Sequence, residues 1–147
     1  MRRAALLALL AAAAATGCGR PGSVELVARL VEVPPGAIRE DPLYNYAAIL
    51  KYEVVRRDRG PEVEPVIYVA HYNPRKPRAR AADRFITGVG GTLKTFRAGD
   101  LHRLCLEPDA EKWYVGGVIN FYLGAADTIY WAVRTDAVPE PPAGRRP

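Results

Sequence analysis

The chain has 147 residues, 49% of them hydrophobic, and a formal net charge of +5 at pH 7. This length is enough for one domain with a real core and excludes two domains of ordinary size. Arginine outnumbers lysine 17 to 4; because this skew is typical of a GC-rich coding sequence, we do not count the positive charge as evidence for nucleic-acid binding.

The N-terminal segment has the parts of a signal peptide. Met1-Arg2-Arg3 precedes an Ala/Leu-rich run over residues 4–15, which is too short to span a membrane as an anchor. Ala15-Thr16-Gly17-Cys18 then resembles the lipobox of bacterial lipoproteins. The resemblance implies removal of residues 1–17 and a diacylglycerol on the sulfur of Cys18. We therefore expect an extracytoplasmic protein, lipid-anchored to the cell membrane or the outer membrane.

Cleavage before the cysteine divides the remaining chain into three parts. Residues 18–23 form a short lipidated tether, residues 24–138 a single β-domain, and the Pro-rich residues 139–147 a tail that cannot pack. The alternative is an ordinary secreted protein that keeps Cys18 as a thiol. Cys105 is the second of the two cysteines; with the first acylated we expect no internal disulfide, and its apolar neighbours favour a buried, inert thiol.

Six segments of the middle part have the composition of β-strands. In chain order they are residues 24–33, 47–57, 66–72, 92–96, 101–107 and 128–135. Alternation in the second segment places Leu50 and Tyr52 inside and Lys51 outside. Arg97-Ala98-Gly99-Asp100 predicts a tight hairpin between the fourth and fifth segments. Helix signals are weak, with short turns expected at residues 78–84 and 109–113.

Five or six strands with irregular connections predict a mainly β fold, a small antiparallel OB-like barrel. The long first strands, a charged central connection and a final hairpin favour this architecture. An immunoglobulin-like sandwich is the alternative, weakened because the sequence lacks the Cys…Trp…Cys framework of such domains.

The residues that carry most chemistry in enzymes are sparse. His71 and His102 are the only histidines; with Asp100 they offer a two-histidine, one-carboxylate metal site, but the spacing is not diagnostic and structural histidines are the simpler interpretation. Ser23, in the tether, is the only serine, which excludes a Ser-His-Asp arrangement in the domain. We expect no catalytic residue and no cofactor; a metal-dependent enzyme using the two histidines is the alternative.

Tyrosine and tryptophan, ten in all, outnumber the three phenylalanines. Their rings combine an apolar face with a polar tip, which suits sugar rings or protein partners. The candidate ligand-binding residues in or beside the predicted connections are Tyr44, Tyr46, Tyr72, Arg75, Trp113 and Tyr114. The basic stretch over residues 75–84 is either a solvated loop or a surface for anionic polysaccharide or lipid headgroups.

A second resemblance rests on three short motifs. Lys51-Tyr52-Glu53-Val54, Val69-Ala70-His71-Tyr72 and the run over residues 99–108 (GDLHRLCLEP) are similar to an uncharacterised extracytoplasmic β-domain associated with polysaccharide O-acylation machinery in bacteria. The resemblance implies an accessory role and no transferable catalytic residue. The sequence thus predicts a membrane-anchored envelope lipoprotein, a non-catalytic binding or accessory module for a glycan or an envelope protein, with no nucleic-acid partner.

Overall fold

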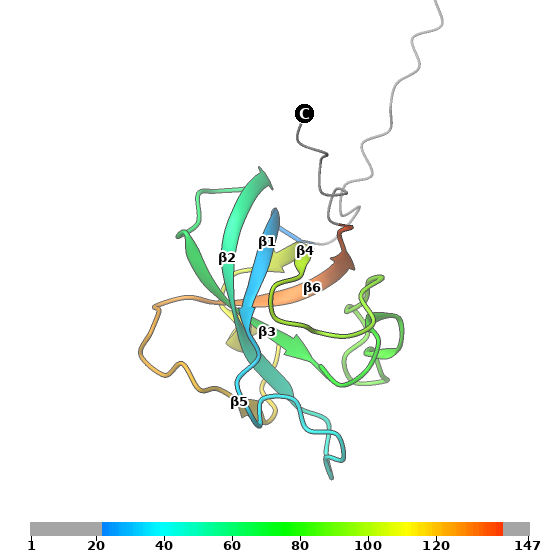
Figure 1. The fold of residues 1–147 in the computed structure, drawn as a ribbon. Coiled ribbons are helices and arrows are strands. Elements are labelled where there is room, and N and C mark those ends of the chain that lie inside the picture. The colour runs from blue at the N-terminus through cyan, green and yellow to red at the C-terminus, as the bar shows by residue number, and fades with distance from the viewer. Residues whose placement is uncertain (1–21, 140–147) are drawn as a thin grey trace, which may run out of the picture.

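The structure is a computed structural model that describes residues 22–139. The predicted signal peptide, Cys18 and residues 140–147 of the predicted tail lie outside this range. The strands are β1 (Val24–Glu32), β2 (Ala47–Arg59), β3 (Val66–Tyr72), β4 (Leu101–Glu107), β5 (Val118–Ile119) and β6 (Ile129–Ala137), and two 3₁₀ helices are η1 (Arg78–Arg80) and η2 (Ala110–Lys112) (Figure 1). Over residues 22–139 no helix has the length and apolar character that crossing a bilayer requires.

Five of the strands close into a barrel in the order β1-β2-β3-β6-β4 and back to β1. Neighbouring strands are antiparallel except β3 and β6, which are parallel. A five-stranded Greek-key barrel with this connectivity is the OB architecture. The prediction of a mainly β, OB-like barrel is therefore confirmed. The immunoglobulin-like alternative is excluded, because the strands form one closed sheet and not two sheets packed face to face.

The connection between β4 and β6, residues 108–128, runs along the outside of the barrel. Its two-residue strand β5 pairs in parallel with the first residues of β2, Ala47 and Ala48. Tyr114 and Tyr122 of the same connection pack on the outer apolar layer of the sheet. The outer face of β2, β3 and β6 is thus partly covered by the chain itself.

The sheet buries apolar side chains on both of its faces. The inner layer includes Leu26, Leu30, Leu50, Tyr52, Val69, Leu104 and Leu106. The outer layer consists of Ala47, Ile49, Ala70, Tyr72, Ala81, Val89, Trp131 and Val133. The alternation predicted for β2 is confirmed, because Leu50 and Tyr52 are fully buried inside while Lys51 is partly exposed.

Residues 92–96 do not form the predicted strand, and the predicted hairpin is therefore absent. Leu93 and Phe96 instead turn their side chains into the barrel interior. The Leu93 carbonyl accepts a hydrogen bond from Arg78 N–H at 2.9 Å. The start of this segment lies close to the backbone of β6, and Gly91 permits this, since a Cβ atom there would lie 2.0 Å from the carbonyl oxygen of Thr135 on β6. The apolar residues of this segment plug the barrel instead of extending the sheet.

Cys105 on β4 is fully buried and disulfide-bonded. Burial was expected from its apolar neighbours, but the expectation of no internal disulfide is contradicted. The only other cysteine of the chain, Cys18, lies outside the described residues. A sulfur that carries a thioether-linked lipid cannot also form a disulfide, so a lipid on Cys18 requires Cys105 to be a buried thiol in the mature protein. The intact mass of the mature chain distinguishes the two states.

Candidate functional site

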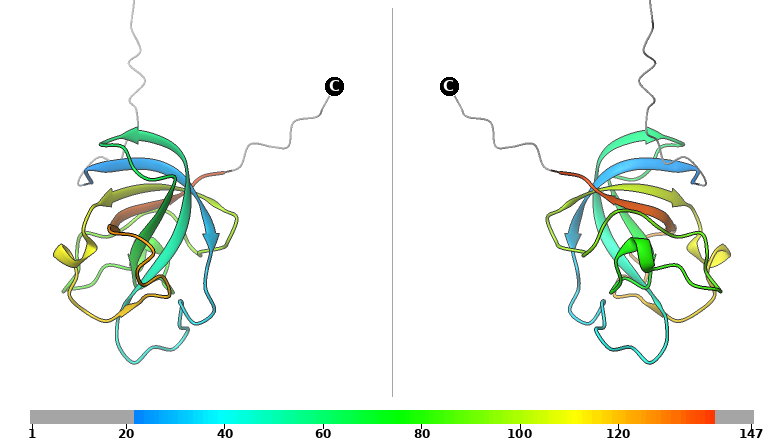
Figure 2. Two further views of the ribbon diagram at one scale, coloured as in Figure 1. Left: turned by 90° about the vertical axis from the view of Figure 1, so that its left-hand side faces the viewer. Right: turned by 90° about the vertical axis from the view of Figure 1, so that its right-hand side faces the viewer.

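A hollow of about 570 Å³ lies where three connections meet. They are residues 33–46 between β1 and β2, residues 73–100 between β3 and β4, and residues 108–128 before β6. The lining residues are Leu43, Tyr44, Asn45, Tyr72, Phe85, Ile86, Tyr114, Val115 and Gly116. Figure 2 shows the connection 33–46 at the end of the molecule opposite to the start of β1. Segments far apart in the sequence therefore build one site.

A second hollow, of about 490 Å³, lies beside the first and shares Leu43, Tyr44 and Asn45 with it. Its other side includes Tyr46 and Val118. Residues 43–45 thus form a ridge between two hollows, so that the side chains on this ridge can contact a partner from both sides.

Asp83 connects the segments that line the first hollow through its side-chain hydrogen bonds. Its carboxylate accepts hydrogen bonds from the Tyr72 hydroxyl at 2.6 Å and from Asn45 Nδ2 at 2.8 Å. The backbone N–H groups of Phe85 and Ile86 donate to its other oxygen, both at 2.8 Å. These hydrogen bonds, led by the one from Tyr72, lower the pKa of Asp83 to about 2. One carboxylate, with both oxygens hydrogen-bonded, therefore links the connection before β2 to strand β3 and to the loop after β3.

Three aromatic rings form a packed group at and beneath the floor of the hollow. The ring centroids of Tyr72 and Tyr114 are 5.3 Å apart, and Tyr114 stacks on Trp131 at 5.5 Å with an interplanar angle of 16°. Burial raises the pKa of Tyr72 to about 12 and also raises the pKa of Tyr114. Both phenols are therefore neutral near pH 7, and the floor is an uncharged group of packed rings.

The edge of the hollow is apolar and exposed. Leu43 is 86%, Tyr44 77%, Phe85 73% and Val115 96% exposed; we call these four residues the apolar rim. Contiguous exposed apolar side chains mark interaction surfaces more often than isolated ones do. The rim and the aromatic floor together form a surface that gains free energy when a partner covers it.

The structure brings three of the six predicted ligand-binding residues to the first hollow: Tyr44, Tyr72 and Tyr114. Tyr46 is 6% exposed, accepts a hydrogen bond from the Arg39 N–H at 2.6 Å, and lines only the second hollow. Arg75 and Trp113 are exposed and line neither. Five further lining residues were not predicted from the sequence: Leu43, Asn45, Phe85, Ile86 and Val115. For the four apolar ones, the signal in the sequence was an apolar side chain outside every predicted strand.

Arg78 belongs to the predicted basic loop but is buried. Its guanidinium donates to the backbone carbonyls of Tyr72 (2.7 Å), Asn73 (2.5 Å) and Lys76 (3.0 Å). It also lies over the ring of Phe96, 5.1 Å from the centroid. Burial lowers the pKa of Arg78 to about 10, so it stays charged near pH 7. The expectation of a solvated basic loop is wrong for this residue, which organises the backbone.

Both histidines lie inside the barrel, on either side of one tyrosine. The Tyr52 hydroxyl is 3.0 Å from His71 Nε2 and 3.1 Å from His102 Nδ1. Neither histidine is exposed. Within residues 22–139 no three side chains of the His, Cys, Asp and Glu type are grouped to hold a metal ion, so Asp100 does not complete the alternative metal site.

The hydrogen-bond pattern of this trio indicates its protonation. His102 Nε2 is buried with no hydrogen-bond partner, whereas the Thr135 hydroxyl lies 3.5 Å from His71 Nδ1. A buried N–H without an acceptor is rarer than an unused lone pair. We therefore assign the proton of His102 to Nδ1, which donates a hydrogen bond to the Tyr52 oxygen. The Tyr52 hydroxyl in turn donates its proton to Nε2 of His71.

The lining of the first hollow consists of aliphatic and aromatic side chains, one amide and one glycine. It contains no histidine, cysteine or serine, and the nearby Asp83 is saturated by hydrogen bonds. A nucleophile next to a general base, the usual sign of covalent catalysis, is absent from these lining residues. The chain matches no protein-family model, no curated protein and no solved structure. A function must therefore be argued from the geometry of the site.

Proposed function

We propose that this chain is a lipid-anchored, non-catalytic binding module of the cell envelope that holds a protein partner at the apolar rim. The observation that carries the proposal is the set of four apolar side chains, 73–96% exposed, around a hollow with a floor of packed aromatic rings. Aliphatic groups such as Leu43 and Val115 favour a protein partner over a glycan, because a sugar site needs more polar groups beside its aromatic ring.

The topology supports the placement of the binding surface. OB barrels bind ligands with the outer face of the second and third strands and with two connections, those between strands one and two and between strands four and five. In this barrel the corresponding connections are residues 33–46 and 108–128, and both line the first hollow. The apolar rim therefore lies where the architecture presents ligand contacts.

A lipid at Cys18 would place the rim away from the membrane. The anchored cysteine lies six residues before β1, which starts at Val24 and leads into the connection 33–46. Nine strand residues span roughly 30 Å, and Figure 1 shows this connection at the far end of β1. The partner would then be met in the aqueous space, not in the bilayer.

Replacing Tyr44 with Ala is expected to weaken partner binding about tenfold, the loss typical of an interface anchor, without changing the melting temperature. Tyr44 is 77% exposed, so its removal leaves no cavity. Trp113→Ala is the matched control, because Trp113 is a partly exposed aromatic residue that lines neither hollow. Retention of envelope proteins on the immobilised chain, identified by mass spectrometry, and binding to a glycan array measure the effect. The proposal would be contradicted if Tyr44→Ala retained the partner as well as the wild type does. It would also be contradicted if Trp113→Ala lost as much partner binding as Tyr44→Ala.

Replacing Cys18 with Ser is expected to abolish membrane anchoring. The wild-type product should partition into detergent, and its intact mass should show acyl groups on residue 18, since two or more chains anchor firmly. Cys105→Ser is the matched control and should remain anchored. An unmodified residue 18 in the wild type, or detergent partitioning of Cys18→Ser, would show that the anchor is absent and that Cys18 is available to other sulfur chemistry.

A further inference from the structure

Residues 92–96, which we call the plug, lie beside the two buried histidines of the barrel. The ring of Phe96 is 4.6 Å from the ring of His71 and 5.8 Å from that of His102, measured between centroids. The guanidinium of Arg78 lies 5.1 Å from the centroid of the same ring. One aromatic side chain therefore packs against both histidines and against the buried arginine of the connection between β3 and β4.

The hydrogen bonds around the two histidines fit neutral rings only. The Tyr52 hydroxyl donates its one proton to Nε2 of His71 and accepts a hydrogen bond from Nδ1 of His102. A proton added to His71 turns Nε2 into a donor, and the Tyr52 proton is then left without an acceptor. A proton added to His102 goes to Nε2, which has no hydrogen-bond partner. Each added proton therefore creates a buried donor without an acceptor, which folded proteins avoid.

The charges that face the two histidines do not compensate an added proton. Within residues 22–139 neither histidine forms an ion pair with a carboxylate. The titratable group bonded to both rings is the neutral phenol of Tyr52 on β2. Burial, followed by the charge of Arg78, lowers the pKa of His71 well below 6.5. Asp100, just before β4, raises the pKa of His102 by its charge, yet burial outweighs this effect and lowers that pKa to about 4. A proton on either ring therefore adds positive charge close to a buried guanidinium.

Release of the plug exposes both histidines to water at a lower cost than opening of the sheet. The plug lies outside every strand of the barrel. It is held by the burial of Leu93 and Phe96 and by a few hydrogen bonds. Among these are the bonds from Leu93 N–H to the Thr135 carbonyl at 3.2 Å and from Arg78 N–H to the Leu93 carbonyl at 2.9 Å. Local opening takes place where such contacts are fewest, so the plug opens before the strands separate.

Arg78 connects the plug to the first hollow. Its guanidinium lies over the aromatic ring of the plug and donates to the carbonyls of Tyr72, a floor residue of the hollow, and Asn73. Asn73 Nδ2 in turn donates to the Ala81 carbonyl at 3.1 Å. Ala81 lies two residues before Asp83, whose carboxylate links the segments around the hollow. Displacement of the plug therefore reaches the wall of the hollow through one short series of contacts.

We propose that the plug is an acid-operated cover: protons on His71 and His102 release it from the barrel, and its release loosens the wall of the first hollow at Phe85 and Ile86. The barrel stays folded while the plug is open. A partner at the apolar rim is then held at neutral pH and released in mild acid. This last consequence rests on the proposed function, whereas the opening of the plug does not.

Amide hydrogen exchange of the mature chain, followed by NMR at pH 7 and pH 5, tests the cover without a partner. After correction for intrinsic exchange rates, the opening constants at Arg78, Ile86 and Leu93 should rise at least about tenfold, because each histidine that titrates in the open state adds a factor of about ten per pH unit below 6.5. The amides of β1 should keep their protection.

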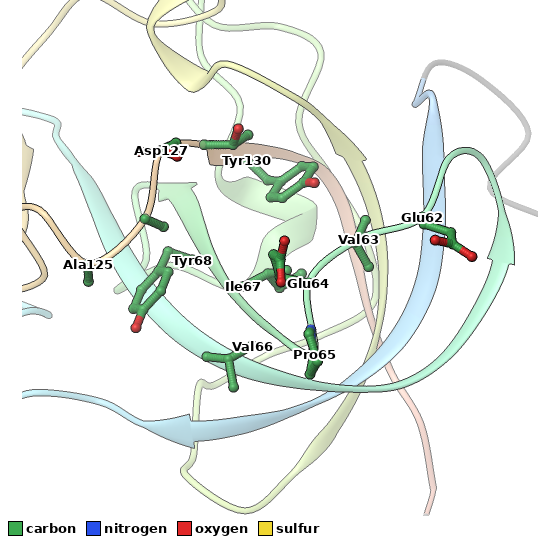
Figure 3. A pocket seen from close by; sticks show the side chains of 12 residues that line it. Glu62, Val63, Glu64, Pro65, Val66, Ile67, Tyr68, Ala125, Asp127 and Tyr130 are labelled. Atoms are coloured by element: carbon green, nitrogen blue, oxygen red, sulfur yellow. The ribbon is translucent and has the colours of Figure 1, made fainter.

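The hollow of about 850 Å³ between the β2–β3 connection and the residues leading into β6 provides an internal control (Figure 3). It is lined by no histidine, so the amides of residues 66–68 should also keep their protection. An unchanged opening constant at Leu93, or an equal rise in β1 and at residues 66–68, would overturn the proposal. A rise at Leu93 with none at Ile86 would overturn the link to the first hollow.

Variants separate the plug from the histidines. Phe96→Ala should raise the opening constant of Leu93 already at pH 7, because it removes the ring that packs against both imidazoles. Phe121→Ala is the matched control, since Phe121 is exposed and belongs to another connection. His71→Gln combined with His102→Gln should make opening independent of pH, and His102→Gln alone should roughly halve the slope. Equal opening of Phe96→Ala and Phe121→Ala, or an unchanged slope in His102→Gln, would overturn the proposal.

Retention of envelope proteins on the immobilised chain at pH 7 and pH 5 relates the cover to the proposed function. The wild type should lose its partner at pH 5, and the double histidine variant should keep it. A partner held equally at both pH values by the wild type would overturn the regulation. If the exchange results hold and no partner is retained at either pH, the cover stands and the proposed function fails.

Discussion

Lowering the pH from 7 to 4 is expected to reduce the free energy of unfolding by about 3 kcal/mol from His102 alone, since one pKa unit corresponds to about 1.4 kcal/mol. Burial lowers the pKa of His102 from 6.5 to about 4. The pKa of His71 is lowered well below 6.5 by burial and also by the charges of Arg78 and His102. Two neutral histidines inside the barrel therefore make it sensitive to acid.

The direction follows from proton binding in the two states. Below pH 6.5 the unfolded chain takes up protons on both histidines, whereas the folded chain resists them. Stability therefore falls as the pH drops through 6.5 and continues to fall until the folded pKa is reached, about 4 for His102. Asp100 reduces the loss of stability at His102, because its charge raises the pKa of that histidine. Arg78 increases the loss at His71, because its charge lowers the pKa there. The Tyr52 hydroxyl does not ionise in this range, because burial raises its pKa well above 10.

Between pH 6.5 and about 4.5 the change in stability can be attributed to His71 and His102, because they are the only histidines of the chain. Carboxylates with lowered pKa, such as Asp83 at about 2, lose their stabilising contribution only as the pH falls below their ordinary value near 4. Urea unfolding at pH 7, 5.5 and 4 measures the slope. The variant His102→Gln, whose amide can still bond to Tyr52, should show a smaller slope. A wild-type free energy that is constant from pH 7 to 4 would contradict the assignment.

The strands were predictable because alternation and composition are local. Residues 66–72 and 101–107 were predicted with the bounds that the structure has, as β3 and β4. The failure at residues 92–96 has a physical cause. A run containing Leu93 and Phe96 has the same composition whether it pairs in a sheet or plugs a barrel, and only Gly91 and its contact with β6 decide between them.

The parallel pairing of β3 with β6 and the strand β5 depend on contacts that no local pattern encodes. β5 has two residues, too few for alternation to be visible. Its pairing with β2 follows from the path of the whole connection 108–128 across the outside of the barrel. Topology of this kind is fixed by closure of the sheet, not by the strand sequences.

The candidate site was half predictable for a similar reason. Tyr44 and Tyr114 were found because aromatic residues in connections are informative on their own. Asp83 was not, because its role exists only when Asn45 and Tyr72 approach it. The histidines, 31 positions apart, were considered together only as metal ligands. Their common partner, Tyr52, was assigned correctly to the interior, but the pattern that placed it there says nothing about what its hydroxyl contacts.

Arg78 provides the second large expected effect. Replacing Arg78 with Met should lower the free energy of unfolding by about 3 kcal/mol, because the carbonyls of Tyr72, Asn73 and Lys76 lose their buried donor. Arg78→Lys should recover little of this loss, since an ammonium lacks the planar fork that reaches separate carbonyls. The cost is expected although a buried charge is itself expensive, because the fold around it supplies acceptors that a methionine leaves unsatisfied.

Arg80 offers the matched control, since it belongs to the same 3₁₀ helix as Arg78 but is exposed. Arg80→Met should change the free energy of unfolding by less than about 0.5 kcal/mol, as is typical of surface positions. Urea unfolding at pH 7 measures both variants, away from the range in which the histidines titrate. If Arg78→Met and Arg80→Met were equally stable, the guanidinium would contribute nothing as a backbone anchor, and the basic stretch would act in solvent as the sequence alone indicated.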